Sequence, residues 1–297
     1  MKSNYFCAEA RSVGEDLFEC GLESASATDH DSTPASRITE RSLPRRGKQA
    51  SARRQILANR HSRRHLIVTI DGPAGSGKSS TAKALAKRIK APYIDTGAMY
   101  RALTLKAMKE GARFEDKRAL VGLLKKAKIE LIGSDPFKQR IQLDGKDVTT
   151  EIRSPELTKN VFHVAQEPVI RREMVKKQRR MGLNNGAVME GRDIGTKVFP
   201  DADYKFYFEA NDQIRAKRRY RELIAAGQNI SLTDVLRDQK KRDSTDYNRK
   251  EGPLKVAKDA IIIDTSSLTI DETVDRILAI IKSRQDRKKR GQLSRVS

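Results

Sequence analysis

The chain has 297 residues, of which 37% are hydrophobic and 34% charged, and its formal net charge at pH 7 is +22. A chain of this length can bury a substantial core, as one large domain or as a core domain with insertions. No apolar run approaches the roughly 18 residues of a membrane-spanning helix, and acidic residues interrupt the start of the chain, where a secretory signal needs an apolar centre. We therefore expect a protein without a membrane span that works in the cytoplasm.

The positive charge is spread along the chain and suggests anionic partners. Residues 1–65 contribute +4 and residues 282–297 contribute +6, so the remaining +12 belongs to residues 66–281. A basic core fits a protein that holds several phosphates at once, although a solvated surface accounts for most of the lysines. Both cysteines, Cys7 and Cys20, precede this core, so we expect it to contain no disulfide.

The two ends of the chain have compositions that differ from the rest. Residues 1–64 mix small, basic and acidic residues without a helical or strand period, and we expect this N-terminal extension to be disordered. An RNA-contacting or targeting arm, or a start assigned upstream of the true domain, are alternatives. At the other end, the basic run over residues 282–290 predicts a solvated tail, residues 284–297, that frays from the last helix.

A phosphate-binding loop organises the rest of the chain. An apolar, β-branched run from residue 66 predicts a buried strand, and the pattern G-x-x-x-x-G-K-S follows it. Gly75 and Gly77 let successive backbone N–H groups point inward, toward the positive end of a helix that starts near Ser79. Lys78 then lies where phosphate charge concentrates, and the Ser79 hydroxyl can bind Mg²⁺. The predicted ATP-binding residues are Gly72, Pro73, Ala74, Gly75, Ser76, Gly77, Lys78, Ser79 and Ser80.

Strands and helices alternate through the core, which predicts an α/β fold with a parallel sheet covered by helices on both faces. Beyond the first strand, we expect strands that end at Asp95, at Glu190 and near residues 208 and 264, and a closing helix over residues 270–281. Polar residues follow several of these strands, and ligands bind at the carboxyl ends of strands in such a sheet.

Two segments depart from this alternation. Residues 113–181 read as a small α+β insertion, with a helix over 117–126, short strands at 129–132 and 140–143, and helical segments from Pro155 and Pro168. An arginine-dense helix over 212–226 and a second helix follow the strand near residue 208.

A set of motifs, taken in order, resembles the bacterial cytidylate kinases, which are nucleoside monophosphate kinases. The motifs are DGPAGSGKS at 71–79, DTGAMYR at 95–101, EIR at 151–153, GRDIG at 191–195, VFPDA at 198–202 and RDSTDYNR at 242–249. The resemblance implies transfer of the γ-phosphoryl group of ATP to CMP or dCMP with Mg²⁺, giving ADP and CDP or dCDP. It also implies a kinase domain over residues 65–283, with the insertion binding the monophosphate and a mobile lid over about 212–250.

The resemblance also assigns residue roles. Arg101, Arg192 and Arg249 match positions that hold the acceptor phosphate, and a planar guanidinium can bind two oxygens at once. Lys78, Arg192 and Arg249 are the predicted catalytic residues; no catalytic base is needed, because the acceptor is an ionised phosphate. The predicted CMP-binding residues are Thr96, Arg101, Arg171, Arg192, Asp193, Arg242, Asp246 and Arg249.

The predicted lid helix carries Arg215 and Arg219. We expect both to reach the ATP phosphates when the lid closes, and ordinary surface arginines are the alternative for each. The same helix contains other basic residues, so neither arginine is distinguished by its neighbours.

Recognition of cytosine requires a carboxylate for the N4 amino group and a cationic donor for N3 and O2. Asp193 and Arg171 match the family positions with these roles. The chain departs from the family at Phe162, where a serine near the base is common. Phe162 either stacks on the base or packs in the core of the insertion, and we expect core packing, because helical phenylalanines are usually buried.

Two other classes of function are open. A P-loop kinase of another small molecule would share the loop, the sheet and the lid, and would differ in the insertion and after Gly191. A nucleic-acid-binding ATPase would account for the charge, but aromatic residues make up only 5% of the chain and are not interleaved with basic ones. We therefore expect ATP and CMP or dCMP as partners, with no requirement for nucleic acid.

Overall fold

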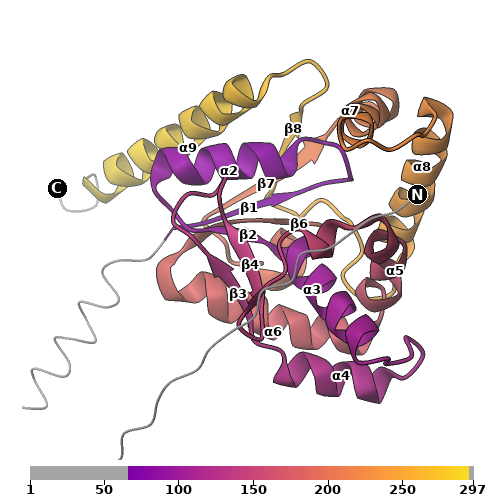
Figure 1. Ribbon diagram of the computed structural model, residues 1–297. Coiled ribbons are helices and arrows are strands. Elements are labelled where there is room, and N and C mark those ends of the chain that lie inside the picture. The colour runs from indigo at the N-terminus through magenta and orange to yellow at the C-terminus, as the bar shows by residue number, and fades with distance from the viewer. Residues whose placement is uncertain (1–65, 294–297) are drawn as a thin grey trace, which may run out of the picture. The chain divides into compact units, whose positions relative to one another are not determined.

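A parallel sheet with the strand order β2-β6-β1-β7-β8 lies at the centre of the fold (Figure 1). The structure is a computed structural model that describes residues 66–293, with side chains described to residue 287. Every pairing in this sheet is parallel, which confirms the predicted α/β class. The strands are β1 (Ile67–Asp71), β2 (Tyr93–Asp95), β6 (Ala187–Gly191), β7 (Tyr204–Glu209) and β8 (Ile261–Asp264), and the helices against them are α2 (Lys78–Ile89), α3 (Thr96–Lys109), α6 (Pro168–Asn185) and α9 (Ile270–Leu293).

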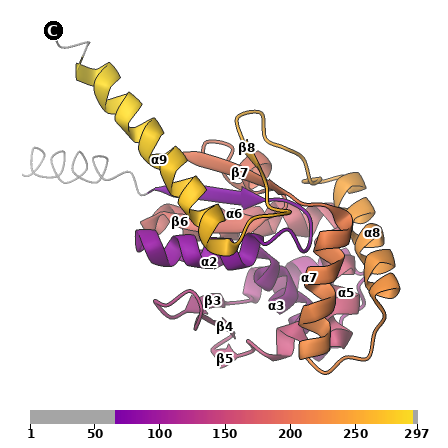
Figure 2. The same ribbon diagram turned by 90° about the horizontal axis from the view of Figure 1, so that it is seen from above.

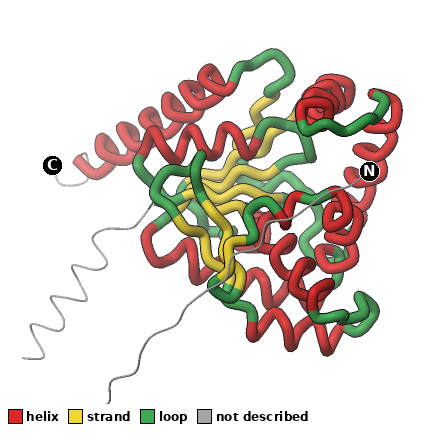
Figure 3. The backbone as a smooth tube through the Cα atoms, in the orientation of Figure 1, coloured by secondary structure: helices red, strands yellow, loops and turns green. Residues whose placement is uncertain are grey.

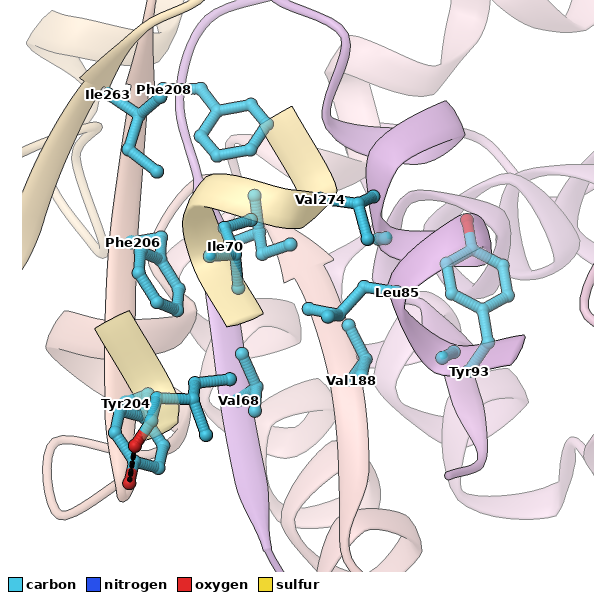
Figure 4. Close-up of a cluster of buried hydrophobic side chains, with 14 residues drawn as sticks. Val68, Ile70, Leu85, Tyr93, Val188, Tyr204, Phe206, Phe208, Ile263 and Val274 are labelled. Carbon is cyan, nitrogen blue, oxygen red and sulfur yellow. Dashed lines mark hydrogen bonds between the residues drawn. The ribbon is translucent and has the colours of Figure 1, made fainter. Parts of the chain in front are cut away.

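Helices cover both faces of this sheet, α2 and α9 on one side and α3 and α6 on the other (Figures 1 and 3). Alternate residues of β1 pack into these two layers. Val68 and Ile70 pack with Leu85 of α2 and Val274 of α9 (Figure 4), whereas Ile67 packs into the layer that includes α6. Each fully buried side chain of this size contributes roughly 1.5–3 kcal/mol. This burial fixes the sheet and thereby the ends of its strands.

The predicted α+β insertion has the expected elements. They are α4 (Lys117–Lys126), β3 (Ile129–Ile132), β4 (Arg140–Leu143), β5 (Lys146–Asp147), a short 3₁₀ turn (Glu151–Arg153) and α5 (Pro155–Ala165). The three short strands form a separate antiparallel sheet. Two hydrophobic clusters attach the insertion to α3, one through the small sheet and one through α4, α5 and α6.

Two helices follow β7, namely α7 (Asp212–Ala225) and α8 (Leu232–Asn248). They lie side by side at the end of the molecule that holds the carboxyl ends of the strands (Figure 2). Asn211 caps α7 by accepting a hydrogen bond from the N–H of Gln213, and Ser231 caps α8 in the same way through Asp234. The backbone of α7 comes so close to the loop after β1 that a Cβ atom on Gly75 would lie 2.9 Å from the carbonyl oxygen of Arg215.

The last helix is longer than the sequence pattern predicts. We expected helix to end near residue 281, but α9 continues to Leu293, so the prediction of a frayed tail from residue 284 is wrong for the described part of that segment. Residues 282–290 contain lysine, arginine and glutamine, which favour helix, and no glycine or proline. Apolar periodicity ends at 281, and it therefore marked the end of burial rather than the end of the helix.

Residues 1–64, for which we predicted disorder, lie outside the described residues, and so do Cys7 and Cys20. Within residues 66–293, no helix is both long and apolar enough to cross a membrane.

Candidate active site

The polar residues predicted at the carboxyl ends of the strands lie at one edge of the sheet. Asp71 of β1 is in register with Gly191 of β6, and Asp95 of β2 is in register with Glu190. Because the strands are parallel, the loops that leave these residues emerge together. Such an edge is where open α/β sheets bind ligands.

The loop after β1 has the conformation that its glycines allow. Gly75 and Gly77 adopt left-handed conformations with φ of 74° and 82°, and α2 begins directly afterwards at Lys78. A Cβ atom at Gly72 would collide with the carbonyl oxygen of Phe208 on β7. These residues, through Ser79 and Ser80 in the first turn of α2, therefore form a compact loop at the positive end of a helix.

Lys78 is buried in this loop. Its Nζ donates hydrogen bonds to the carbonyl of Pro73 across 2.6 Å and to the hydroxyl of Ser76 across 3.4 Å. Burial, and next the positive charge of Arg192, lower the pKa of Lys78 to about 7. A phosphate beside Nζ would favour the charged lysine, so a bound anion and the ammonium group would stabilise each other here.

Asp71 connects the loop to the segment that follows β6. Its two carboxylate oxygens accept hydrogen bonds from the N–H groups of Ile194 and Gly195, at 2.8 and 2.7 Å. Ile194–Val198, which follow β6, form a single π-helical turn. Asp71 thereby fixes the backbone next to Arg192 and Asp193, two of the predicted site residues.

Glu190 is a buried carboxylate that sequence reasoning did not single out. It accepts a hydrogen bond of 2.7 Å from the hydroxyl of Tyr93, and Thr96 donates another of 2.7 Å to its backbone carbonyl. Burial, followed by the charge of Asp95, raises the pKa of Glu190, whereas Lys78 and the Ser79 hydroxyl act in the opposite direction. A glutamate inside an otherwise apolar strand was the signal for it, because such a residue is rarely buried without partners.

Several of the predicted arginines form a cationic cluster, and one of them, Arg192, lies near Lys78 of the loop. Burial, and then the neighbouring charge of Arg242, lower the pKa of Arg101 to about 10. Burial and the charge of Arg192 likewise lower the pKa of Arg242. The guanidinium groups therefore repel one another in a partly desolvated space, an arrangement that favours binding of an anion.

Asp246 balances part of this charge. It accepts hydrogen bonds from Arg192 at 2.7 Å and from Arg249 at 3.2 Å. Burial alone would raise the pKa of Asp246, but the charges of these two arginines outweigh burial and lower it. The carboxylate thus holds both guanidinium groups at one place.

Arg171 and Asp193 form a buried ion pair beside this cluster. Nη2 of Arg171 donates to Asp193 across 2.6 Å, and the Arg171 guanidinium lies 5.2 Å from the centre of the Tyr100 ring. Nη2 of Arg249 approaches the second oxygen of Asp193 at 3.4 Å. Among the described residues, Nε of Arg171 and Nη2 of Arg249 are buried without a hydrogen-bond partner. Buried donors of this kind favour a ligand with acceptor atoms.

The two arginines predicted on the lid helix have different surroundings. Arg215 is buried, and it donates hydrogen bonds to the carbonyl of Ala74 at 2.9 Å and to Asp243 at 2.7 Å. It is therefore not an ordinary surface arginine. Arg219 is partly exposed and pairs with Glu222 at 2.9 Å, one turn along the same helix. Contact of either side chain with ATP stays a prediction.

The expectation that Phe162 packs in the core of the insertion is wrong. The side chain is 45% exposed, whereas Leu157 and Val164 of the same helix are buried. The preference of phenylalanine for the interior is overridden here because Phe162 lies at the margin of the buried face of α5.

Comparison with known proteins adds independent evidence. A family model described as cytidylate kinase matches residues 68–283. A cytidylate kinase from Geobacillus sp. (strain WCH70) is 48% identical over 222 residues, which cover 75% of this chain and 99% of that protein. The chain belongs to the cytidylate kinase family. A second cytidylate kinase, from Caldanaerobacter subterraneus subsp. tengcongensis, is 47% identical over 72% of this chain and 94% of its own length.

Solved structures give a weaker likeness. A gluconokinase from Sinorhizobium meliloti 1021 is 15% identical, with 76% of this chain and 97% of that chain covered and a TM-score of 0.41. A likeness at that level carries no functional argument. Family membership therefore rests on sequence, and the resemblance that the motifs indicated is confirmed.

Proposed function

We propose that this member of the cytidylate kinase family transfers the γ-phosphoryl group of ATP to CMP or dCMP, giving ADP and CDP or dCDP. The observation that carries the proposal is the placement of the arginine cluster. Arg192 lies near Lys78 of the phosphate-binding loop, Asp246 pairs with both Arg192 and Arg249, and Arg249 approaches Asp193 of the buried Arg171–Asp193 pair. Such an arrangement suits an acceptor that carries both a phosphate and a polar base.

The chemistry requires mainly positioning and neutralisation. Two phosphorylated substrates repel each other, and the transferring group keeps its negative charge throughout, so fixed cations in the right geometry lower the barrier. Lys78 lies where the β- and γ-phosphates would be held by the loop. Arg192 is close enough to Lys78 to lower its pKa, so it can span the donor and acceptor phosphates. Arg249 adds a second guanidinium beside Arg192 through their shared partner Asp246.

The residues near the loop fit a magnesium ion that travels with ATP. The hydroxyl of Ser79 lies in the first turn of α2, beside the buried carboxylate of Glu190. Magnesium bound chiefly by phosphates and water needs only one or two protein oxygens. That requirement is compatible with the finding that residues 66–287 contain no cluster of three or more metal-binding side chains. When bound, Mg²⁺ would neutralise phosphate charge; Ser79 and Glu190 would orient it, directly or through water.

Selection of cytosine follows from the donor and acceptor pattern of the Arg171–Asp193 pair. The Asp193 carboxylate accepts from an amino group such as N4, and the free Nε donor of Arg171 suits N3 or O2. Uracil has a carbonyl oxygen at position 4, which would face a carboxylate. A buried site built for one pattern rejects the other strongly.

Phosphorylation of a panel of CMP, dCMP, UMP, AMP and GMP by ATP tests the proposal. We expect CMP or dCMP to give the highest kcat/KM, activity to require Mg²⁺, and Lys78→Ala to abolish turnover in a folded protein. Activity toward a different small molecule, with none toward CMP, would favour a P-loop kinase of another substrate. ATP hydrolysis stimulated by RNA, again without CMP phosphorylation, would favour a nucleic-acid-binding ATPase.

The same proposal includes two assignments of segments and one of location. Residues 113–181 would bind the monophosphate, since Arg171 and the Arg101 contacts on α5 belong to this insertion. Residues 212–250 would form the lid, because α7 and α8 carry Arg215, Arg219 and Arg242 to the loop and the cluster. A cytoplasmic location fits substrates that are cytoplasmic nucleotides.

A further inference from the structure

We propose that the ring of Phe162 packs against the pyrimidine of the acceptor nucleotide. The inference rests on the proposed function and adds a residue that sets the affinity for the base. It starts from a side chain that is large, apolar and exposed, on a helix whose buried residues are Leu157 and Val164.

The position of Phe162 on α5 places it between two arginines of the site. Thr158, one turn earlier on the same face, accepts a hydrogen bond from Nη1 of Arg101 across 2.9 Å. Ala165, nearly one turn later, accepts one from Nη1 of Arg171 across 2.8 Å through its backbone carbonyl. Residues at this spacing share a helix face. Phe162 therefore borders the space between the arginine proposed to hold the phosphate and the arginine proposed to read the base.

A row of aromatic rings supports Phe162 from behind. The His163 ring lies 3.8 Å from the Phe162 ring, centre to centre, and its other neighbour, Phe114, is stacked on it at 5.2 Å with an interplanar angle of 4°. Phe114 packs in turn against the hydrophobic cluster of α3, α4, α5 and α6. The exposed ring is thus held by partners that connect it to the core, so little conformational entropy is lost when it receives a base.

Stacking on an aromatic side chain strengthens binding of any base, because every base has a π-face. The interaction is made equally in the ground state and in the transition state, since the base does not react. Its loss should therefore raise the Kd and KM for CMP by roughly 5- to 150-fold and leave kcat nearly unchanged. Loss of the ring should weaken the binding of UMP to a similar degree, whereas the Arg171–Asp193 pair is proposed to discriminate between the two bases.

The experiment compares Phe162→Ala with Phe162→Tyr, which keeps the ring, and with Phe137→Ala as a matched control. Phe137 is also exposed, at 53%, but it lies in the β3–β4 connection under Lys87. Calorimetry gives the Kd for CMP, and steady-state kinetics gives kcat and the KM for CMP, UMP and ATP. Inhibition by ribose 5-phosphate, which has the phosphate but no base, reports whether the phosphate site is intact.

We expect Phe162→Ala to raise the Kd for CMP at least about fivefold. The KM for ATP and the inhibition constant of ribose 5-phosphate should stay within about twofold of the wild-type values. Phe162→Tyr and Phe137→Ala should bind CMP as the wild type does. If Phe162→Ala binds CMP within twofold of a wild type that phosphorylates CMP, the stacking proposal is wrong and the proposed function stands. A wild type without CMP phosphorylation refutes the proposed function instead. Equal losses for CMP and ribose 5-phosphate would show a disturbed insertion rather than a lost stack, and would also overturn the inference.

Discussion

Replacing Arg215 by leucine should destabilise the fold by about 3–5 kcal/mol, because it leaves Asp243 buried without its charged partner. Both side chains are almost inaccessible, and Nη2 of Arg215 lies 2.7 Å from the Asp243 carboxylate. The same variant loses the hydrogen bonds from Arg215 to the carbonyls of Ala74 and Ala210, at 2.9 and 3.1 Å. The free energy of unfolding of a domain is about 5–15 kcal/mol, so this substitution removes a large fraction of the stability.

Urea unfolding of Arg215→Leu, Asp243→Leu and the double variant measures the coupling. The double variant should recover much of the loss, since two apolar residues leave no unpaired buried charge. Asp212 provides the control: it also pairs with Arg215, at 2.5 Å, but its carboxylate is exposed, so Asp212→Ala should cost no more than about 1 kcal/mol. Strictly additive losses in Arg215→Leu and Asp243→Leu would refute the idea that this ion pair stabilises the packing of α7 against α8.

Three further predictions concern the site. Lys78→Ala should abolish turnover yet unfold at nearly the wild-type urea concentration, since the lysine acts on phosphate charge; a near-normal kcat would contradict this. Asp193→Ala should lower kcat/KM for CMP at least about tenfold and reduce the preference over UMP, and an unchanged CMP/UMP ratio would exclude it as the base reader. Burial raises the pKa of Asp71 to about 6, so folding favours the protonated carboxyl group. The protonated group therefore contributes fully to the free energy of unfolding below about pH 4, and this contribution is lost as pH rises through 6. Compared with Asp71→Asn, the wild type should therefore lose about 1 kcal/mol of unfolding free energy between about pH 5 and pH 8, and parallel profiles would argue against a raised pKa.

The loop, the parallel strands and the insertion could be predicted because their signals are local. The G-x-x-x-x-G-K-S pattern fixes a backbone conformation within a few residues, and apolar runs separated by amphipathic helices specify a parallel sheet. The carboxyl ends of strands follow from that topology, which is why Asp95 and Gly191 could be expected at one edge. The cytidylate kinase motifs added predicted roles for individual arginines, which no local pattern contains.

Features that depend on distant partners could not be read in advance. Arg215 contacts Ala74, which is 141 positions away, so nothing in its own helix distinguishes it from its basic neighbours. The hydrogen-bond partner of the Glu190 carboxylate is Tyr93 on the neighbouring strand β2, 97 positions away. Phe162 is exposed because it lies at the margin of the buried face of α5, and residue type alone predicted the opposite. In each case the packing of separate elements decides the outcome.

The acidic residues of the cluster explain how a fold tolerates so many desolvated arginines. Asp246 pairs with Arg192 and Arg249, and Asp193 pairs with Arg171 and approaches Arg249, so each carboxylate offsets two guanidinium groups. Neutralisation is incomplete, since the pKa of Arg249 is lowered by burial and by the charge of Arg171. Under the proposed function, a nucleoside monophosphate would supply the missing negative charge and the acceptor atoms together. The affinity for CMP should therefore fall as the salt concentration rises, and Arg249→Ala should bind CMP more weakly than the wild type. An affinity independent of salt would show that the carboxylates already neutralise the arginines.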